Sequence, residues 1–88
     1  MKIIVRENGT GHRCITACDM VEYEPASDRL YVRQADLNGT VKSVMIIEKA
    51  RTAGRENDSG SEAASRIMDD LNSREYCKIV CDMFKVYI

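Results

Sequence analysis

The chain has no tryptophan, and it has one phenylalanine, one proline and one histidine among its 88 residues. A core built from it is therefore aliphatic, with methionine and cysteine as fillers. No apolar run approaches the length of about 18 residues that a membrane-spanning helix needs, so we expect no membrane partner. The apolar run in MKIIVREN is too short for a secretory signal, so we expect a cytoplasmic protein.

The sequence also lacks an excess of charge of one sign. It has 13 basic and 14 acidic residues and a net charge of −1. A non-specific nucleic-acid binder usually shows a basic excess or a basic stripe, and the sequence shows neither. We therefore do not expect non-specific nucleic-acid binding.

The length predicts a single domain over residues 1–88, close to the size at which one core becomes marginal. Alternating apolar residues, bounded by turn residues such as Asn8-Gly9 and Pro25, predict a series of antiparallel strands. The expected strands are Lys2–Arg6, Arg13–Glu24, Arg29–Ala35 and Thr40–Lys49.

The second half of the chain begins with a polar segment, residues 49–60, in which we expect a mobile loop. Ser59 followed by Glu62 fits a capping box, and an apolar stripe continues from there to Leu71, which predicts an amphipathic helix. The segment from Tyr76 to Ile88 fits both a helix and a strand period, and its β-branched residues favour a strand with a bulge near Met83–Phe84.

Together these elements predict an α+β fold: an antiparallel four- to five-stranded sheet, in the order β-β-β-β-α-β, with one helix packed on a face. An edge strand of such a sheet is exposed, and a homodimer through that edge is a further expectation.

Two cysteine pairs, Cys14/Cys18 and Cys77/Cys81, have the same spacing near opposite ends of the chain. If their segments were antiparallel neighbours, Cys14 would face Cys81 and Cys18 would face Cys77. Residues four apart on a strand are separated by about 13 Å, so neither pair chelates one ion by itself. The spacing favours core packing, with a disulfide or redox pair and a metal site as the open alternatives.

Two groups of polar residues are candidate binding sites. Alternation places Arg29, Tyr31 and Arg33 on one strand face, and this set with Lys49, Arg51 and Arg55 is the predicted protein-binding surface. The alternative is an anion site. Its residues are Gly9, Gly11, His12 and Arg13 in one loop and Ser61 at the helix start. An ordinary solvent face and ordinary turns explain the same patterns.

No catalytic constellation accompanies these groups. His12 is the only histidine, and neither it nor Cys14 has an evident orienting acid. We therefore predict that the protein is not an enzyme and needs no cofactor.

The composition favours a small intracellular protein that binds another protein by surface complementarity. Its size suggests a phage or mobile-element product that inhibits a host defence protein. The alternatives are a protein, monomeric or dimeric, that sequesters a small anion or nucleotide, and a thiol-dependent metal or redox protein.

Overall fold

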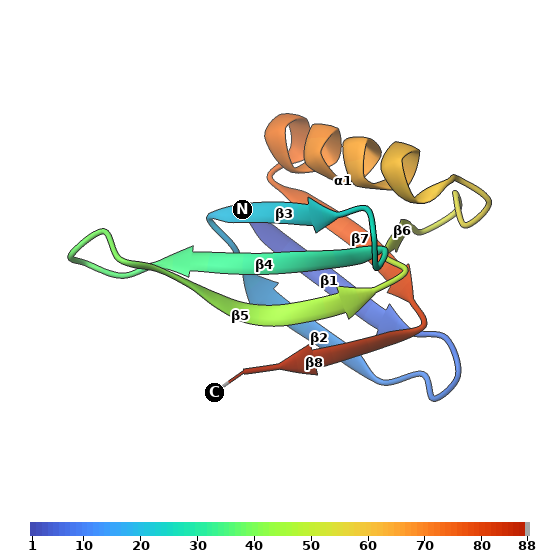
Figure 1. Ribbon diagram of the computed structural model, residues 1–88, viewed down its shortest axis with the longest axis horizontal. Coiled ribbons are helices and arrows are strands. Elements are labelled where there is room, and N and C mark those ends of the chain that lie inside the picture. The colour runs from blue at the N-terminus through green and yellow to red at the C-terminus, as the bar shows by residue number, and fades with distance from the viewer. Residues whose placement is uncertain (88) are drawn as a thin grey trace.

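The computed structural model describes residues 1–87. It contains two four-stranded sheets packed face to face and one helix across an open side of the pair (Figure 1). The elements are β1 Lys2–Glu7, β2 Arg13–Ala17, β3 Met20–Glu24, β4 Arg29–Ala35, β5 Val41–Glu48, β6 Arg51–Thr52, α1 Gly60–Arg74, β7 Tyr76–Cys81 and β8 Met83–Val86. The α+β class is confirmed, with two sheets in place of the single one expected.

Each sheet draws strands from both ends of the chain. Sheet A has the order β2-β1-β7-β6, and its central pair, β1 and β7, is parallel. Sheet B has the order β3-β4-β5-β8 and is antiparallel throughout. The first and last thirds of the sequence therefore meet in the middle of sheet A.

The chain changes sheets at two aspartates. Cys18 donates its N–H to the Met1 carbonyl at 2.9 Å in sheet A, whereas the next residue, Asp19, donates to the Arg33 carbonyl at 2.9 Å in sheet B. The expected single strand Arg13–Glu24 is therefore wrong, because it is divided between β2 and β3.

The second crossing lies between β7 and β8. Asp82 donates its N–H to the Glu48 carbonyl at 3.1 Å, and the chain leaves sheet A for sheet B. The preference for a strand in the last segment is confirmed over the described residues. The bulge expected near Met83–Phe84 is instead a change of sheet, and Ile88 lies outside the described residues.

The core fills the space between the two sheets and reaches the helix. Its largest fully buried side chains are aliphatic or contain sulfur: Ile3, Leu30, Met45, Ile47, Ile67, Ile79, Val5, Val32, Cys77 and Cys81. The helix buries Ala63, Ala64, Ile67 and Leu71 and contacts β3, β6 and β7. It thus closes a side of the sandwich and does not lie on the outer face of a sheet, as Figure 1 shows.

The helix starts where the sequence indicates, although Ser59 forms no side-chain capping bond. It ends at Glu75, whose φ of 62° is left-handed. Among the described residues, no helix is long and apolar enough to cross a membrane. The preceding segment, residues 49–60, is not a loop throughout, because it contains β6 paired with β7.

An ion pair ties the sheets together beside the helix start. Arg51 of β6 donates to both carboxylate oxygens of Asp28, at 3.2 and 2.8 Å, and Asp28 also accepts the Tyr23 hydroxyl at 3.0 Å. The Arg51 guanidinium holds the pKa of Asp28 below its ordinary value. A Cβ at Gly60 would overlap the Tyr23 hydroxyl, so a larger residue at the helix start would require Tyr23 to move away from this cluster.

We predict that Arg51→Met lowers the free energy of unfolding by about 1.5–3 kcal/mol, because Asp28 loses a two-pronged charged partner in a half-buried site. Urea denaturation at pH 7 measures this. Arg29→Met is the control, since it removes a more exposed pair with Glu48 and should cost clearly less than Arg51→Met.

The difference in unfolding free energy between wild type and Arg51→Met should depend on pH. The lowered pKa of Asp28 stabilises the fold above the unfolded-state pKa of about 3.9, and this stabilisation is lost as the pH falls through the folded-state value. The gap between wild type and Arg51→Met should therefore shrink in acid. A gap that is equal for both substitutions, or independent of pH, contradicts this account.

Candidate functional site

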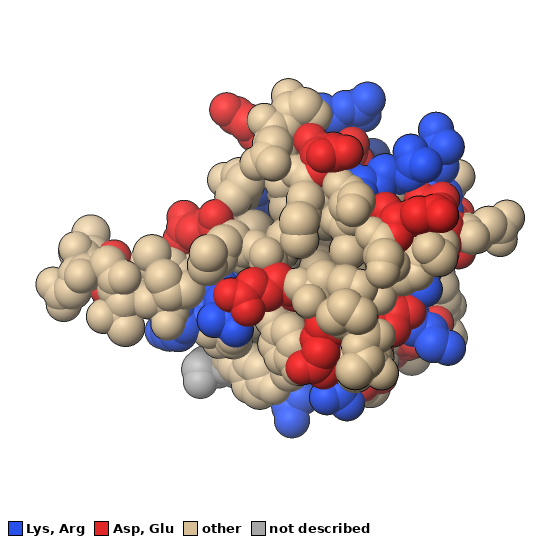
Figure 2. All heavy atoms as spheres, turned by 45° about the horizontal axis from the view of Figure 1, so that its top comes forward, with Lys and Arg blue, Asp and Glu red and all other residues tan. Residues whose placement is uncertain are grey.

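The predicted strand-face residues Arg29, Tyr31 and Arg33 do lie on one face, the outer face of sheet B, because Leu30 and Val32 between them are buried. Both arginines are already paired. Arg29 contacts Glu48 at 3.2 Å, and Arg33 contacts Glu22 at 3.1 Å. Figure 2, which views sheet B and the helix, shows acidic and basic groups interspersed across this side.

Lys49 and Arg51 both lie near Arg29, because the Asp28 carbonyl accepts the Lys49 N–H at 2.9 Å and the Asp28 carboxylate binds Arg51. Lys49 pairs with Asp82 at 3.7 Å, and Arg51 is committed to Asp28. Arg55 is exposed in the turns before the helix. Arg29, Lys49 and Arg51 therefore lie close together around Asp28, but each is already paired with a carboxylate.

The predicted anion site is also divided. Gly9, Gly11 and His12 form the turn between β1 and β2, with Gly11 at a φ of 75°. Arg13 begins β2. Ser61 lies elsewhere, in the first turn of α1, in a hollow that it shares with Glu62, Ser65, Arg66 and Asp69. The two carboxylates disfavour an anion in that hollow.

All four cysteines are free thiols, and three of them are buried. β1 lies between β2 and β7, so the two cysteine segments are not neighbours. Within residues 1–87, no group of three or more His, Cys, Asp or Glu side chains could hold a metal ion. Burial raises the pKa of Cys77 to about 12 and of Cys81 to about 11, and it also raises that of Cys18. These positions suit core packing.

We predict that a disulfide reagent at pH 8 modifies at most one thiol of the native protein quickly. Cys14 is the half-buried candidate, and the three buried thiols should react only as fast as the protein opens, because the thiolate is the reactive form. All four should react at once in guanidinium. Rapid reaction of two or more native thiols would show that the pairs are accessible for redox or metal chemistry.

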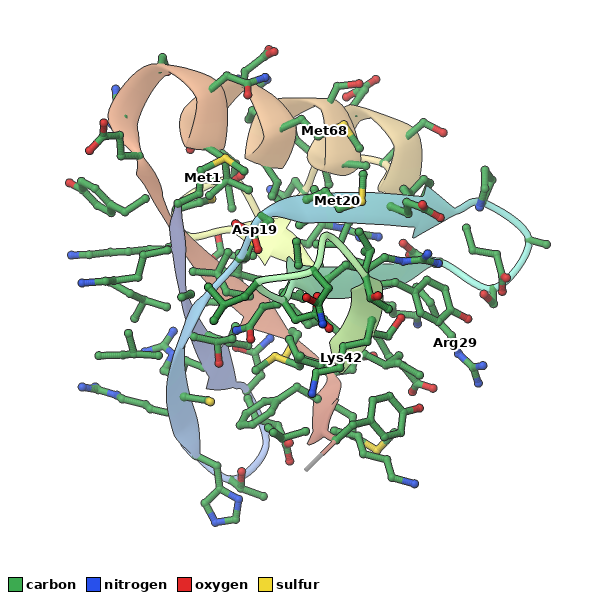
Figure 3. All side chains as sticks on the ribbon, turned by 90° about the vertical axis from the view of Figure 1, so that its left-hand side faces the viewer. Met1, Asp19, Met20, Arg29, Lys42 and Met68 are labelled. Carbon is green, nitrogen blue, oxygen red and sulfur yellow. The ribbon has the colours of Figure 1, made fainter. Side chains whose placement is uncertain are left out.

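The outer face of sheet A carries cations without partners. Its side chains alternate with the buried Ile3, Val5, Cys77 and Ile79. We call this surface the cationic face and define it by the outward residues of β1, β2 and β7, which are Lys2, Ile4, Arg6, Arg13, Ile15, Ala17, Tyr76, Lys78 and Val80. Figure 3 shows side chains with nitrogen ends projecting from this sheet, on the left, away from sheet B.

None of the four cations of this face has a carboxylate partner among the described residues. The five ion pairs within residues 1–87 use Arg29, Arg33, Lys49, Arg51 and Arg66. Lys2, Arg6, Arg13 and Lys78 are all exposed, and among residues 1–87 none of their side chains donates a hydrogen bond; thiol contacts reach Arg6 and Lys78 only at their backbone carbonyls. The face therefore presents uncompensated positive charge.

Two of these cations oppose each other directly. Arg6 of β1 is in register with Arg13 of β2. Like charges opposite each other on antiparallel strands destabilise a sheet. The fold tolerates this repulsion at a position where any neutral residue would avoid it.

Apolar side chains lie among these cations, with Ile4 on the central strand β1 and Ile15 beside it on the edge strand β2. Ile15 is 65% exposed, and Tyr76 is 46% exposed. A shallow groove of about 300 Å³ runs past Ile4, Val80 and Ala53 and is flanked by Arg6, Arg13 and Lys78. A second groove, which shares Ile4 and Lys78, continues to Tyr76, Arg74 and Glu75. Ile4 and Ile15 are thus flanked by Lys2, Arg6, Arg13 and Lys78.

Comparison of the chain with protein-family models, curated proteins and solved structures found no match. Of the residues singled out in the sequence, only Arg13 belongs to the cationic face. Lys2, Arg6 and Lys78 were missed, although the even positions of the first strand do alternate with its buried residues. That alternation shows which residues of β1 share a face, but only the pairing of β1 with β7 shows that Lys78 lies on the same surface.

We predict that Arg13→Thr raises the free energy of unfolding by about 0.2–1 kcal/mol at low salt, because it removes the repulsion from Arg6 and adds a residue that favours strands. Urea denaturation measures this, and added salt should reduce the gain through screening. Arg33→Thr is the control and should not stabilise, since Arg33 is paired with Glu22. A loss of stability in Arg13→Thr would mean that the arginine supports the fold.

Proposed function

We propose that this protein is a non-enzymatic binding protein whose cationic face docks on an acidic surface of another protein. The observation that carries the proposal is the set of four exposed cations beside apolar side chains, two of them in direct opposition and none in an ion pair among the described residues. A carboxylate-bearing partner would relieve the repulsion between Arg6 and Arg13 and cover Ile15.

The make-up of the face favours a protein over a nucleic acid. Protein interfaces combine an apolar core with a polar rim, and here Ile4 and Ile15 lie between cations. Sheets that bind single-stranded nucleic acids present several aromatic platforms for stacking, and Tyr76 is the one aromatic residue on this surface.

We also propose the biological setting that the size and composition suggest, inhibition of a host protein by a product of a phage or mobile element. A small domain that acts by covering a surface needs no catalytic group. Such inhibition would require the partner's functional site to lie beneath the cationic face.

The test compares two matched double variants. Arg6→Glu with Arg13→Glu reverses the cationic face, and Arg29→Glu with Arg33→Glu changes the net charge equally on the outer face of sheet B. We predict at least tenfold weaker binding, about 1.4 kcal/mol, for the first pair only. The readout is recovery of a partner from cells that encode the protein, followed by cross-linking to locate the contact.

The proposal fails if the sheet B variant loses the partner, if neither variant does, or if cross-links map to a basic surface. Preferential capture of single-stranded nucleic acid by the wild-type face would also contradict it. Circular dichroism of both variants checks that the fold is retained.

A second candidate is a nucleotide-sized anion in the groove beside Arg6, Arg13 and Lys78, whose volume of about 300 Å³ lies at the lower limit for small-molecule sites. In the same set of proteins, a nucleotide that raises the melting temperature of the wild type and the sheet B variant, but not of the cationic-face variant, favours this candidate. Without such a shift, the protein-binding proposal stands alone.

A further inference from the structure

The direction of each backbone group in β2 follows from its pairing with β1. Cys18 donates to the Met1 carbonyl at 2.9 Å, and Glu7 donates to the His12 carbonyl at 2.8 Å. Both bonds use even-numbered residues on the β2 side. Since successive residues of a strand point their N–H and C=O groups to opposite edges, Cys14 and Thr16 also bond to β1.

The odd-numbered residues Arg13, Ile15 and Ala17 therefore direct their backbone N–H and C=O groups away from β1, in the plane of the sheet. β2 is an edge strand of sheet A. Of the outward backbone groups of Arg13, Ile15 and Ala17, only the Ala17 carbonyl has a hydrogen-bond partner among the described residues. It accepts from the Gln34 side-chain amide at 2.6 Å. The edge has no proline and no bulge to block an added strand.

The side of the sandwich next to this edge is also uncovered. The helix closes the side formed by β3, β6 and β7. On the other side, β2 and β8 are the two sheet edges, and Cys14 and Phe84 behind them are only partly buried although they pack against the core. A strand added to β2 would cover this opening.

Resting on the proposed function, we infer that the partner binds by adding an extended strand, acidic and apolar in alternation, to the free edge of β2. The residues whose backbones face the edge, Arg13, Ile15 and Ala17, are the same residues whose side chains lie on the cationic face. An incoming strand of this pattern would thus direct its carboxylates to the cationic face beside Arg13 and its apolar side chains to the inner face, over the partly buried Cys14 and Phe84, while bonding to the backbones of Arg13 and Ile15.

Charge selects this occupant over a second copy of the chain. Pairing of two β2 edges around Ile15 would join two cationic faces into one surface with eight cations and no carboxylate. An acidic strand instead neutralises Arg13 and its unpaired neighbour Arg6. The chemistry of the edge therefore favours an acidic segment of a different protein.

The probe is a blocked synthetic peptide of about seven residues that alternates glutamate and valine, with a lysine and valine peptide as the control. Amide hydrogen exchange is followed residue by residue by NMR. We expect the glutamate peptide to slow exchange at Arg13, Ile15 and Ala17 on the order of tenfold, while Cys14 and Thr16, already bonded to β1, change little. The lysine peptide should have no effect.

Two substitutions at one position isolate the backbone contribution. Ile15→Pro removes an N–H that makes no bond within the sheet, and edge strands tolerate proline in that orientation. Ile15→Thr removes the same apolar side chain but keeps the N–H. We expect the proline variant to bind the glutamate peptide at least tenfold more weakly than the threonine variant.

Other results overturn the inference, each in a distinguishable way. If the glutamate peptide changes the NMR chemical shifts of Lys2, Arg6 and Lys78 but does not slow amide exchange at Ile15, the proposed function stands and strand addition is refuted. Equal protection by both peptides would support a strand at the edge and refute the acidic partner. Protection of Ile15 that grows with protein concentration alone would assign the edge to a second copy, and absence of any binding refutes the inference.

Discussion

The parallel pairing of β1 with β7 is the constraint on which the rest of the structure depends. It runs in unbroken register from Lys2 opposite Tyr76 to Glu7 opposite Cys81. On the inner side it joins Ile3 and Val5 to Cys77 and Ile79, which form the floor of the core. On the outer side it brings Lys78 beside the cations of β1, so one interaction between distant segments creates both the hydrophobic core and the charged surface. Sheets built from parallel strands are usually covered on both faces, and the uncovered outer face is consistent with a partner there.

Local features of the fold could be predicted from sequence because local forces determine them. The strand Arg29–Ala35 was predicted with its observed bounds, since alternation and flanking turns leave little choice. The helix start followed from the polar residues near Ser59. Sheet membership could not be predicted in the same way. Asp19 interrupts an otherwise continuous strand pattern. Only two bonds reveal that the chain has entered another sheet: Asp19 donates its N–H to the Arg33 carbonyl, and its carboxylate accepts the Ala35 N–H.

The cationic face could not be predicted from the sequence for a related reason. A net charge of −1 describes an average, whereas binding depends on where the charges lie. In the fold, Glu22 and Glu48 pair with arginines of sheet B, and Asp28 and Asp58 pair near the helix. These four acidic residues are thus engaged elsewhere, and the cations of sheet A form no ion pair among the described residues. Arg29 and Arg33, which the sequence predicts to bind a partner, are instead paired with Glu48 and Glu22 in the fold.

The most direct test of this account is the measurement of backbone nuclear Overhauser effects between the two ends of the chain in solution. The account predicts contacts between β1 and β7 in parallel register, with Ile4 beside Lys78 and Val5 beside Ile79, and contacts from β1 to β2 on its other edge. Contacts that join β2 directly to β7, with Cys14 facing Cys81, would contradict it. They would remove β1 from the centre of sheet A, and the cationic face with it.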